Sequence, residues 1–428
     1  MTTSGLSLDQ APPFHTVALL LAGAPIFGVI LSLTGLWAND ELLLLHHPKT
    51  LAFTHLLALG VLMFAMSGAM MQMMPVLSGA KFPAPWRTSP LITLLLAAGT
   101  LLLAFGLATS NQSFLTLALP VVGGGVALFT FLGHIAMRRA TSPMPTTRVM
   151  HLALANLVVG LCFGLYLLAS HAQGEITAHH YNIVTLHALW MLFGWAIMLL
   201  MGVAWQVVPM FWVTTSYPKR CFFITPTVFM AALVMVSIAT LFDLPLLKQA
   251  SIILLALAGI GFASVTLRRI LTRKRPIIDT TLSFWYLGLV SLIASMILLI
   301  VSIFVEGEMT LWLAGILAGY GALAGIVAGM LYKIIPFLVW FHLSSQGHSD
   351  LPTMRDFAPE ERSRLHFWLH GAALLMLLLA QMVPLLLYPA FMAMGIGWAI
   401  QVLILGKALI YYRKKSREAP FLRESFIA

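Results

Sequence analysis

Long apolar stretches alternate with short polar ones along almost the whole chain. Twelve of the apolar stretches are long enough to cross a bilayer core of about 30 Å, which takes roughly 20 helical residues. They fall near residues 16–37, 52–77, 90–109, 114–137, 151–171, 182–212, 223–242, 249–267, 282–304, 309–340, 366–387 and 389–412. This pattern predicts an all-α integral membrane protein of twelve transmembrane helices. Residues 1–428 then form a single polytopic membrane domain, with a polar loop or short surface helix near 341–365.

Lys and Arg are distributed unevenly between the two sets of loops. The loops after the even-numbered helices and the C-terminal tail, which share one side with the N-terminal tail, carry nearly all of them, whereas the opposite side carries Lys49 and Lys248. Cytoplasmic loops are enriched in Lys and Arg, so both termini are expected in the cytoplasm, in a bacterial inner membrane. If one helix were missed or added, the Lys and Arg residues would fall on both sides of the membrane. Their confinement to one side therefore supports the number of helices as well.

The composition agrees with this placement and narrows the classes of partner. Apolar residues make up 60% of the chain and charged residues 9%, while the net charge is +10. The basic excess lies at the predicted cytoplasmic face, where anionic lipid headgroups are its partners, and no nucleic acid is required. Cys162 and Cys221 are the only cysteines, which excludes a disulfide framework, an iron–sulfur cluster and a thiolate zinc site.

A short motif recurs near the inner end of every fourth helix. It reads Gly-x3-(Gln/Lys)-x2-Pro and occurs at Gly68–Pro75, Gly202–Pro209 and Gly329–Pro336, with Gln72, Gln206 and Lys333 at its polar position. A glycine allows close approach of a neighbouring helix, and a proline can bend the helix. We therefore expect three pseudo-repeated four-helix units, near 16–137, 151–267 and 282–412.

Two histidines lie in the outer third of equivalent helices, the second and the sixth. His55 precedes Gly68 and His187 precedes Gly202. An ionisable side chain inside a membrane marks a functional site by default, and imidazole suits haem iron and copper. His55 shares a helical face with Met63, Met66, Met70 and Met73, and His187 shares one with His180, Met191, Met198, Met201 and Trp205. We expect both faces to point inward and the methionines to serve mainly as core packing.

Other histidines are weaker candidates for metal binding. On the predicted outer side these are His46, His47, His179 and His180. On the inner side His366 and His370 lie four residues apart on one helical face, a spacing that can share a metal. Histidines near an interface more often extend their polar tip towards water, which is the expectation for this pair.

The features that are missing also exclude some functions. The predicted helix interiors hold almost no carboxylates, which ion-coupled carriers usually need near the midplane. No nucleotide-binding loop or Gly-x-Ser-x-Gly elbow is present. A coupled transporter and a hydrolase are therefore disfavoured. If the protein is an enzyme, it is expected to be an oxidoreductase.

The helix number and these motifs resemble the catalytic subunit of the haem-copper oxidases. That subunit has twelve helices in three four-helix arcs, and a haem-ligand His, a Gly and a Pro follow one another on its second helix, as His55, Gly68 and Pro75 do here. The paired histidines of its tenth helix are absent, with Ala314 and Ile316 at the corresponding places, and so is the tandem His-His on the seventh. The resemblance therefore does not extend to a complete oxygen-reducing site.

The run His-Ala-Leu-Trp-Met-Leu-Phe-Gly at 187–194 is similar to the NnrS-type family of haem- and copper-containing membrane proteins tied to nitric-oxide stress. The resemblance implies haem, copper or both, with His187 and His55 as ligands, and redox chemistry or nitric-oxide handling. A periplasmic electron donor or another membrane subunit would be the protein partner. Two alternatives stay open: a copper-handling or transport protein without haem, and a cofactor-free scaffold of oxidase fold.

Overall fold

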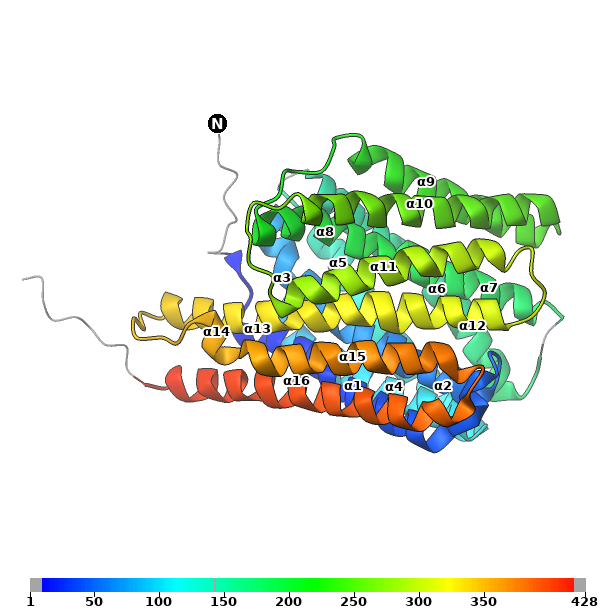
Figure 1. The fold of residues 1–428 in the computed structure, drawn as a ribbon, viewed down its shortest axis with the longest axis horizontal. Helices are drawn as coiled ribbons and strands as arrows, with labels where there is room; N and C mark the ends of the chain where they lie inside the picture. The colour runs from blue at the N-terminus through cyan, green and yellow to red at the C-terminus, as the bar shows by residue number, and fades with distance from the viewer. Residues whose placement is uncertain (1–9, 142–143, 177, 419–428) are drawn as a thin grey trace, which may run out of the picture.

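The computed structural model of the chain describes residues 10–141, 144–176 and 178–418. Within these ranges all regular structure is helical. Twelve helical spans are long and apolar enough to cross a membrane, and they lie side by side as an elongated bundle (Figure 1). The prediction of an all-α, multi-pass membrane protein with twelve spans is confirmed.

Nine of the spans contain one main α-helix, and three are divided by a π-helical segment. The undivided helices are α1 (Phe14–Ala38, extended by η2, Asn39–Leu43), α4 (Pro85–Ala108), α5 (Gln112–Arg138), α6 (Pro145–Gln173), α9 (Cys221–Leu241), α10 (Pro245–Leu271), α11 (Thr280–Val301), α15 (Glu360–Ala380) and α16 (Leu387–Lys415, preceded by η6, Pro384–Leu386). The divided spans are α2–η3–α3 (Pro48–His55, Leu56–Met63, Phe64–Ser78), α7–η4–α8 (His180–Leu189, Trp190–Ile197, Met198–Trp212) and α12–η5–α13 (Met309–Ile316, Leu317–Ala324, Gly325–Ser345). We call these three the second, sixth and tenth spans.

The predicted eleventh helix, 366–387, is misplaced in the sequence analysis. The structure starts α15 at Glu360 and ends it at Ala380, and the next span begins at Pro384. An unbroken apolar run conceals this turn, but Pro384 lacks the N–H that a continuing helix needs. Gln381 stabilises the turn, since its side-chain amide donates to the carbonyl of Leu43 over 3.0 Å. The surface helix expected near 341–365 is present as α14 (Met354–Phe357).

The two described chain ends lie at the same end of the bundle. The ring of Phe14, at the start of α1, stacks on Tyr412, near the end of α16, with ring centres 3.7 Å apart. Figure 1 shows α1 and α16 running alongside each other. We call this end, which also holds the end of α5, the basic end, because most Lys and Arg residues flank it in the sequence.

The three π-helical segments occupy the same register relative to the recurring motif. Each covers eight residues, and the intervals from Leu56 to Gly68, from Trp190 to Gly202 and from Leu317 to Gly329 are all twelve residues. Segments of this kind are rare and frequent at functional sites. Nothing in the sequence pattern indicated them.

Each motif glycine lies against the helix that begins its own predicted unit. A Cβ atom added at these positions would clash with the neighbour, at 2.9 Å from a methyl carbon of Leu21 for Gly68, 3.0 Å from a methyl carbon of Val149 for Gly202, and 2.6 Å from Cβ of Phe284 for Gly329. The missing side chain therefore permits close helix packing at three corresponding contacts.

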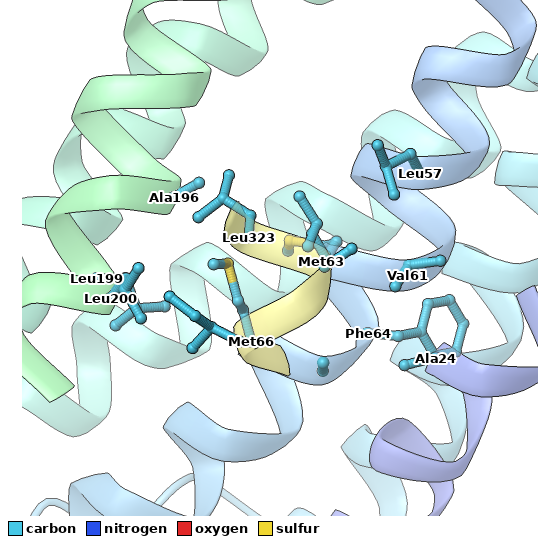
Figure 2. Close-up of a cluster of buried hydrophobic side chains, with 14 of the residues drawn as sticks. Ala24, Leu57, Val61, Met63, Phe64, Met66, Ala196, Leu199, Leu200 and Leu323 are labelled. Carbon is cyan, nitrogen blue, oxygen red and sulfur yellow. The ribbon is translucent and has the colours of Figure 1, made fainter. Parts of the chain in front are cut away.

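The second, sixth and tenth spans meet in the centre of the bundle. Figure 2 shows Met63 and Met66 of the second span close to Leu199 and Leu200 of the sixth and Leu323 of the tenth. Both methionines are buried among apolar side chains. The inward direction of the methionine faces is confirmed, and these two side chains serve as packing.

Candidate functional site

His55 and His187 come together near the ends of the second and sixth spans that lie away from the basic end. His55 is the last residue of α2 and precedes η3, while His187 lies in the last turn of α7 before η4. Both side chains are half-buried. Sequence spacing placed each histidine on an inward face, but only the packing of the two spans brings the rings together.

Each imidazole is held by a backbone carbonyl. Nδ1 of His55 donates to the carbonyl of Leu51 over 2.7 Å, and Nδ1 of His187 donates to the carbonyl of Gly160 over 2.9 Å. A carbonyl only accepts hydrogen bonds, so in both rings the proton belongs to Nδ1 and the lone pair to Nε2. Metal-binding histidines are typically oriented in this way by their second nitrogen.

The separation of the two rings matches that of two ligands on one metal. Their centres are 6.2 Å apart and their planes differ by 16°. With metal–nitrogen bonds of about 2 Å, the centres of two imidazoles on one ion lie about 5–6 Å apart. Gly164 on α6 leaves the space that the His187 ring occupies, because a Cβ there would lie 2.7 Å from Cε1 of the ring. The geometry thus permits the two rings to share one ion.

The other outer histidines do not gather into a site with these two. His46 faces Glu308 at 3.7 Å, His47 accepts a hydrogen bond from the backbone of Lys49, and His180 packs edge-on against His171. His179 is exposed at the start of α7. Across the described residues no group of three or more His, Cys, Asp or Glu side chains could hold a metal. A site with three such ligands is therefore not present there.

His366 and His370 on α15 differ from the expectation of an interfacial pair. Both are buried, at 1% and 0% exposure, because α15 begins six residues before His366 and carries both rings into the bundle. Nδ1 of His366 lies 2.9 Å from the hydroxyl of Tyr332. The His370 ring stacks on Tyr320 of η5, near its carbonyl, but neither ring nitrogen makes a hydrogen bond of standard geometry.

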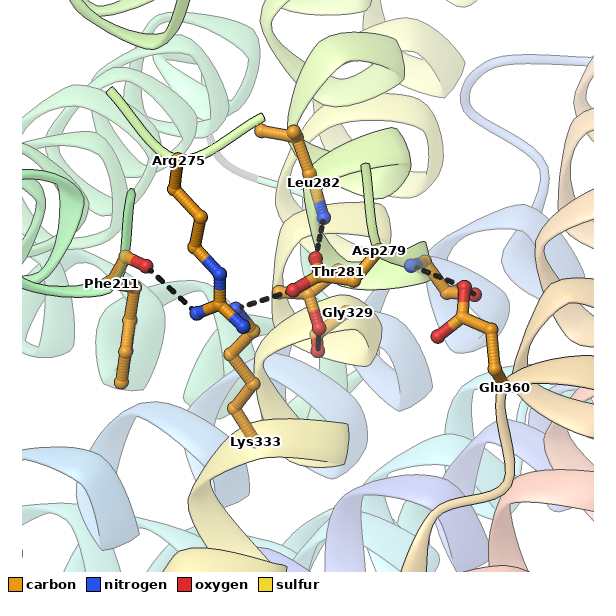
Figure 3. Close-up of polar contacts among 9 residues, drawn as sticks. Phe211, Arg275, Asp279, Thr281, Leu282, Gly329, Lys333 and Glu360 are labelled. Carbon is orange, nitrogen blue, oxygen red and sulfur yellow. Dashed lines mark hydrogen bonds and ion pairs between the residues drawn. The ribbon is translucent and has the colours of Figure 1, made fainter. Parts of the chain in front are cut away.

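The inner end of the tenth span contains an ion pair that the sequence analysis missed. Lys333, the polar residue of the third motif, contacts Asp279 at 2.8 Å, with both side chains less than one-fifth exposed. Figure 3 shows this pair beside Arg275, which donates to the carbonyl of Phe211. Asp279 also caps α11 by accepting from the backbone of Leu282. The Asp-Thr-Thr sequence before an apolar run was the available signal for this cap.

Comparisons with known proteins do not add to this geometry. No model of a protein family matches the chain, and no curated protein sequence matches it either. The assignment of a function therefore rests on the arrangement of the residues themselves.

Proposed function

We propose that the protein is a haem- or copper-binding redox protein of the bacterial inner membrane, in which His55 and His187 hold one metal centre. The observation that carries the proposal is the near-parallel pair of imidazoles 6.2 Å apart, each with Nδ1 on a backbone carbonyl. The character of the site is that of the haem-copper-oxidase-like and NnrS-type proteins, and its role is redox chemistry or nitric-oxide handling.

The donor set fits haem iron, which His55 and His187 would hold through Nε2. Two neutral imidazoles with free Nε2 atoms are a standard ligand chemistry for iron in haem. Bound haem would supply one-electron transfer and an affinity for nitric oxide. The protein contributes the orientation of both rings through the carbonyls of Leu51 and Gly160. The site lies towards the predicted periplasmic side, where an electron donor would reach it.

The test is an absorption spectrum of the detergent-purified protein, oxidised and dithionite-reduced, with metal analysis of the same sample. We expect a Soret band in the parent, lost or shifted in His55→Ala and His187→Ala. His342→Ala is the matched control, because it removes a histidine from the other end of the bundle. Full cofactor content in both site variants would refute the proposed ligation.

A copper site without haem is the second candidate, favoured by the small number of donors. No carboxylate or thiolate accompanies the two imidazoles within the described residues, and neutral, low-coordinate donors suit Cu(I) better than a buried dication. Copper near one equivalent without a Soret band would establish this alternative. A colourless, metal-free parent protein would exclude both candidates and leave the scaffold role.

We also propose that the chain consists of three pseudo-repeated four-helix units. The equal intervals between the π-helical segments and the motif glycines support this, as do the three corresponding glycine contacts. A unit that inserts as a four-helix piece should tolerate a linker between units. We expect the helices to stay assembled when linkers are inserted between units, near 142 and 276. Linkers inserted within a unit, at 110 or 243, should prevent assembly.

The proposed orientation places both termini in the cytoplasm. It is supported by the basic loops together with the described chain ends at one end of the bundle. Fusions of green fluorescent protein to the C-terminus should fluoresce, and alkaline phosphatase fused after Lys248 should be active. The reverse result would place the His55–His187 pair on the cytoplasmic side.

A further inference from the structure

A groove between α5 and α6 opens near the basic end of the bundle, away from the His55–His187 pair. It has a volume of about 350 Å³, and its apolar walls include Phe131 and Leu161. Phe131 and Val158, both at its edge, are 64% and 42% exposed. Since these residues lie in membrane-spanning helices, the groove opens towards lipid.

The depth of the groove corresponds to one leaflet. Its lining on α5 extends from Arg138, the last residue of the helix, to Ala127. Those eleven intervals at 1.5 Å per residue cover about 16 Å. Half of a bilayer core of about 30 Å is about 15 Å. The groove therefore reaches from the headgroup level to near the midplane.

Positive and titratable nitrogen groups are concentrated at its headgroup end. Arg138 and His134 line the groove, and the ring of His151 lies edge-on to His134 with centres 5.1 Å apart. Nδ1 of His134 donates to the carbonyl of Thr130 over 2.8 Å, so in the protonated ring the Nε2–H is left to donate to a phosphate oxygen. The lining contains no Asp or Glu, and Arg138 has no ion-pair partner among the described residues.

A second groove of similar form lacks this charge. It lies between α9 and α10, with a volume of about 240 Å³, and its lining includes Trp205, Cys221 and Phe262 but no Lys, Arg or His. The two grooves thus offer an apolar space with and without a cationic end. The α9–α10 groove can therefore serve as the uncharged control when lipid binding at the α5–α6 groove is tested.

We propose that the α5–α6 groove is a binding site for an anionic phospholipid, with an acyl chain along the apolar wall and the phosphate at Arg138 and His134. Basic pockets between membrane helices recognise anionic headgroups in this way. Arginine matches phosphate oxygens with two parallel N–H donors. Zwitterionic lipid fits the apolar wall equally well but carries a second, positive group that the same cations repel.

The experiment is native mass spectrometry of the full-length protein with dioleoylphosphatidylglycerol or dioleoylphosphatidylcholine added at equal concentration. We expect the parent to retain phosphatidylglycerol preferentially. Arg138→Gln should weaken that retention about fivefold, the weight of one basic side chain near an anionic surface. Arg268→Gln is the matched control. Arg268 lies in the last turn of α10, as Arg138 lies in the last turn of α5, but α10 borders the uncharged groove.

A second variant separates the groove from general surface charge. Ala127→Trp places an indole in the deep end, where Ala127 is exposed, and it should abolish retention although Arg138 is unchanged. Equal retention of both lipids by the parent would overturn the proposal, as would equal effects of Arg138→Gln and Arg268→Gln. Displacement of the lipid by decylubiquinone at stoichiometric concentration would assign the groove to a quinone instead.

Discussion

The second, sixth and tenth spans share a backbone but differ in the side chains at their ends. All three have an eight-residue π-helical segment followed at a constant interval by a glycine that contacts a neighbouring helix. Away from the basic end, the second and sixth spans carry His55 and His187, whereas the tenth has Ile316 at the place of His55. At the inner end, Lys333 replaces the glutamines and pairs with Asp279.

This comparison separates positions that build the bundle from positions that carry chemistry. The glycines and π-helical segments recur because they set how the spans approach one another. The tenth span lacks the histidine, and the second and sixth lack the lysine, although all three spans share the same backbone features, so these features do not require either residue. The chemistry is therefore expected where the three spans differ, and four changes test that expectation.

The largest expected effect is the loss of bound metal from the second and sixth spans. His187→Ala should lower metal affinity by about 100-fold or more, since even residues that only orient a ligand contribute 10–100-fold. His370→Ala should retain the metal but lower stability, because it empties a buried site. Metal analysis and thermal unfolding of both variants measure this. Equal metal loss in the two would move the site to α15.

The next effect concerns the lysine that distinguishes the tenth span. Lys333→Gln introduces the residue of the other two spans and leaves Asp279 without its partner. Removing one member of a buried pair costs about 3–5 kcal/mol, and the partial exposure of this pair reduces the expected loss to about 2 kcal/mol. Unfolding in mixed micelles with dodecyl sulfate measures it.

The double variant Lys333→Gln/Asp279→Asn controls for charge. It should recover much of the stability, because no unpaired carboxylate remains. No recovery would mean that Lys333 acts through its contacts with the rings of Phe211 and Trp212, each 5.1 Å from Nζ.

Replacing each of the three motif glycines by alanine should have a smaller effect on the free energy of unfolding, and comparing the three variants tests whether the glycines are equivalent. Gly329→Ala should cost about 1–2 kcal/mol, since its Cβ would lie 2.6 Å from Cβ of Phe284, an atom that cannot move without its backbone. At Gly68 and Gly202 the nearest atom is a side-chain methyl carbon at 2.9 and 3.0 Å, so a smaller shift relieves the contact and the gain in helix propensity of about 1 kcal/mol offsets it. Unfolding midpoints of the three variants should follow this order. A large loss at all three would indicate a more rigid interface than these contacts imply.

The smallest expected effect concerns the support of one π-helical segment. The buried amide of Asn156 donates to the carbonyl of Gly194 in η4 over 2.9 Å. Asn156→Leu keeps the branching at Cγ but removes the amide donor, and it should cost about 1 kcal/mol, the usual weight of one hydrogen bond. Amide hydrogen exchange across 190–197 measures the local loss, with η3 as the unchanged reference. Unaltered exchange in η4 would show that packing alone maintains the segment.

Hydropathy predicted the number of spans and most of their approximate extents, because crossing a bilayer requires one long apolar helix each time. It failed at 366–387, where two helices share one apolar run and only Pro384 marks the turn. Helical periodicity also predicted the inward faces of His55 and His187. It could not predict the π-helical segments, which depend on hydrogen bonds that shift by one residue under tertiary packing.

The sequence by itself thus determined an all-α membrane protein, the recurring glycine motif and two intramembrane histidines worth testing. The tertiary structure alone decided that these two rings are parallel neighbours, that His366 and His370 are buried, and that Lys333 meets Asp279. The physical reason is that hydropathy and periodicity are properties of one helix, whereas each of these contacts joins helices far apart in the chain. Such contacts depend on side-chain volumes at several interfaces at once.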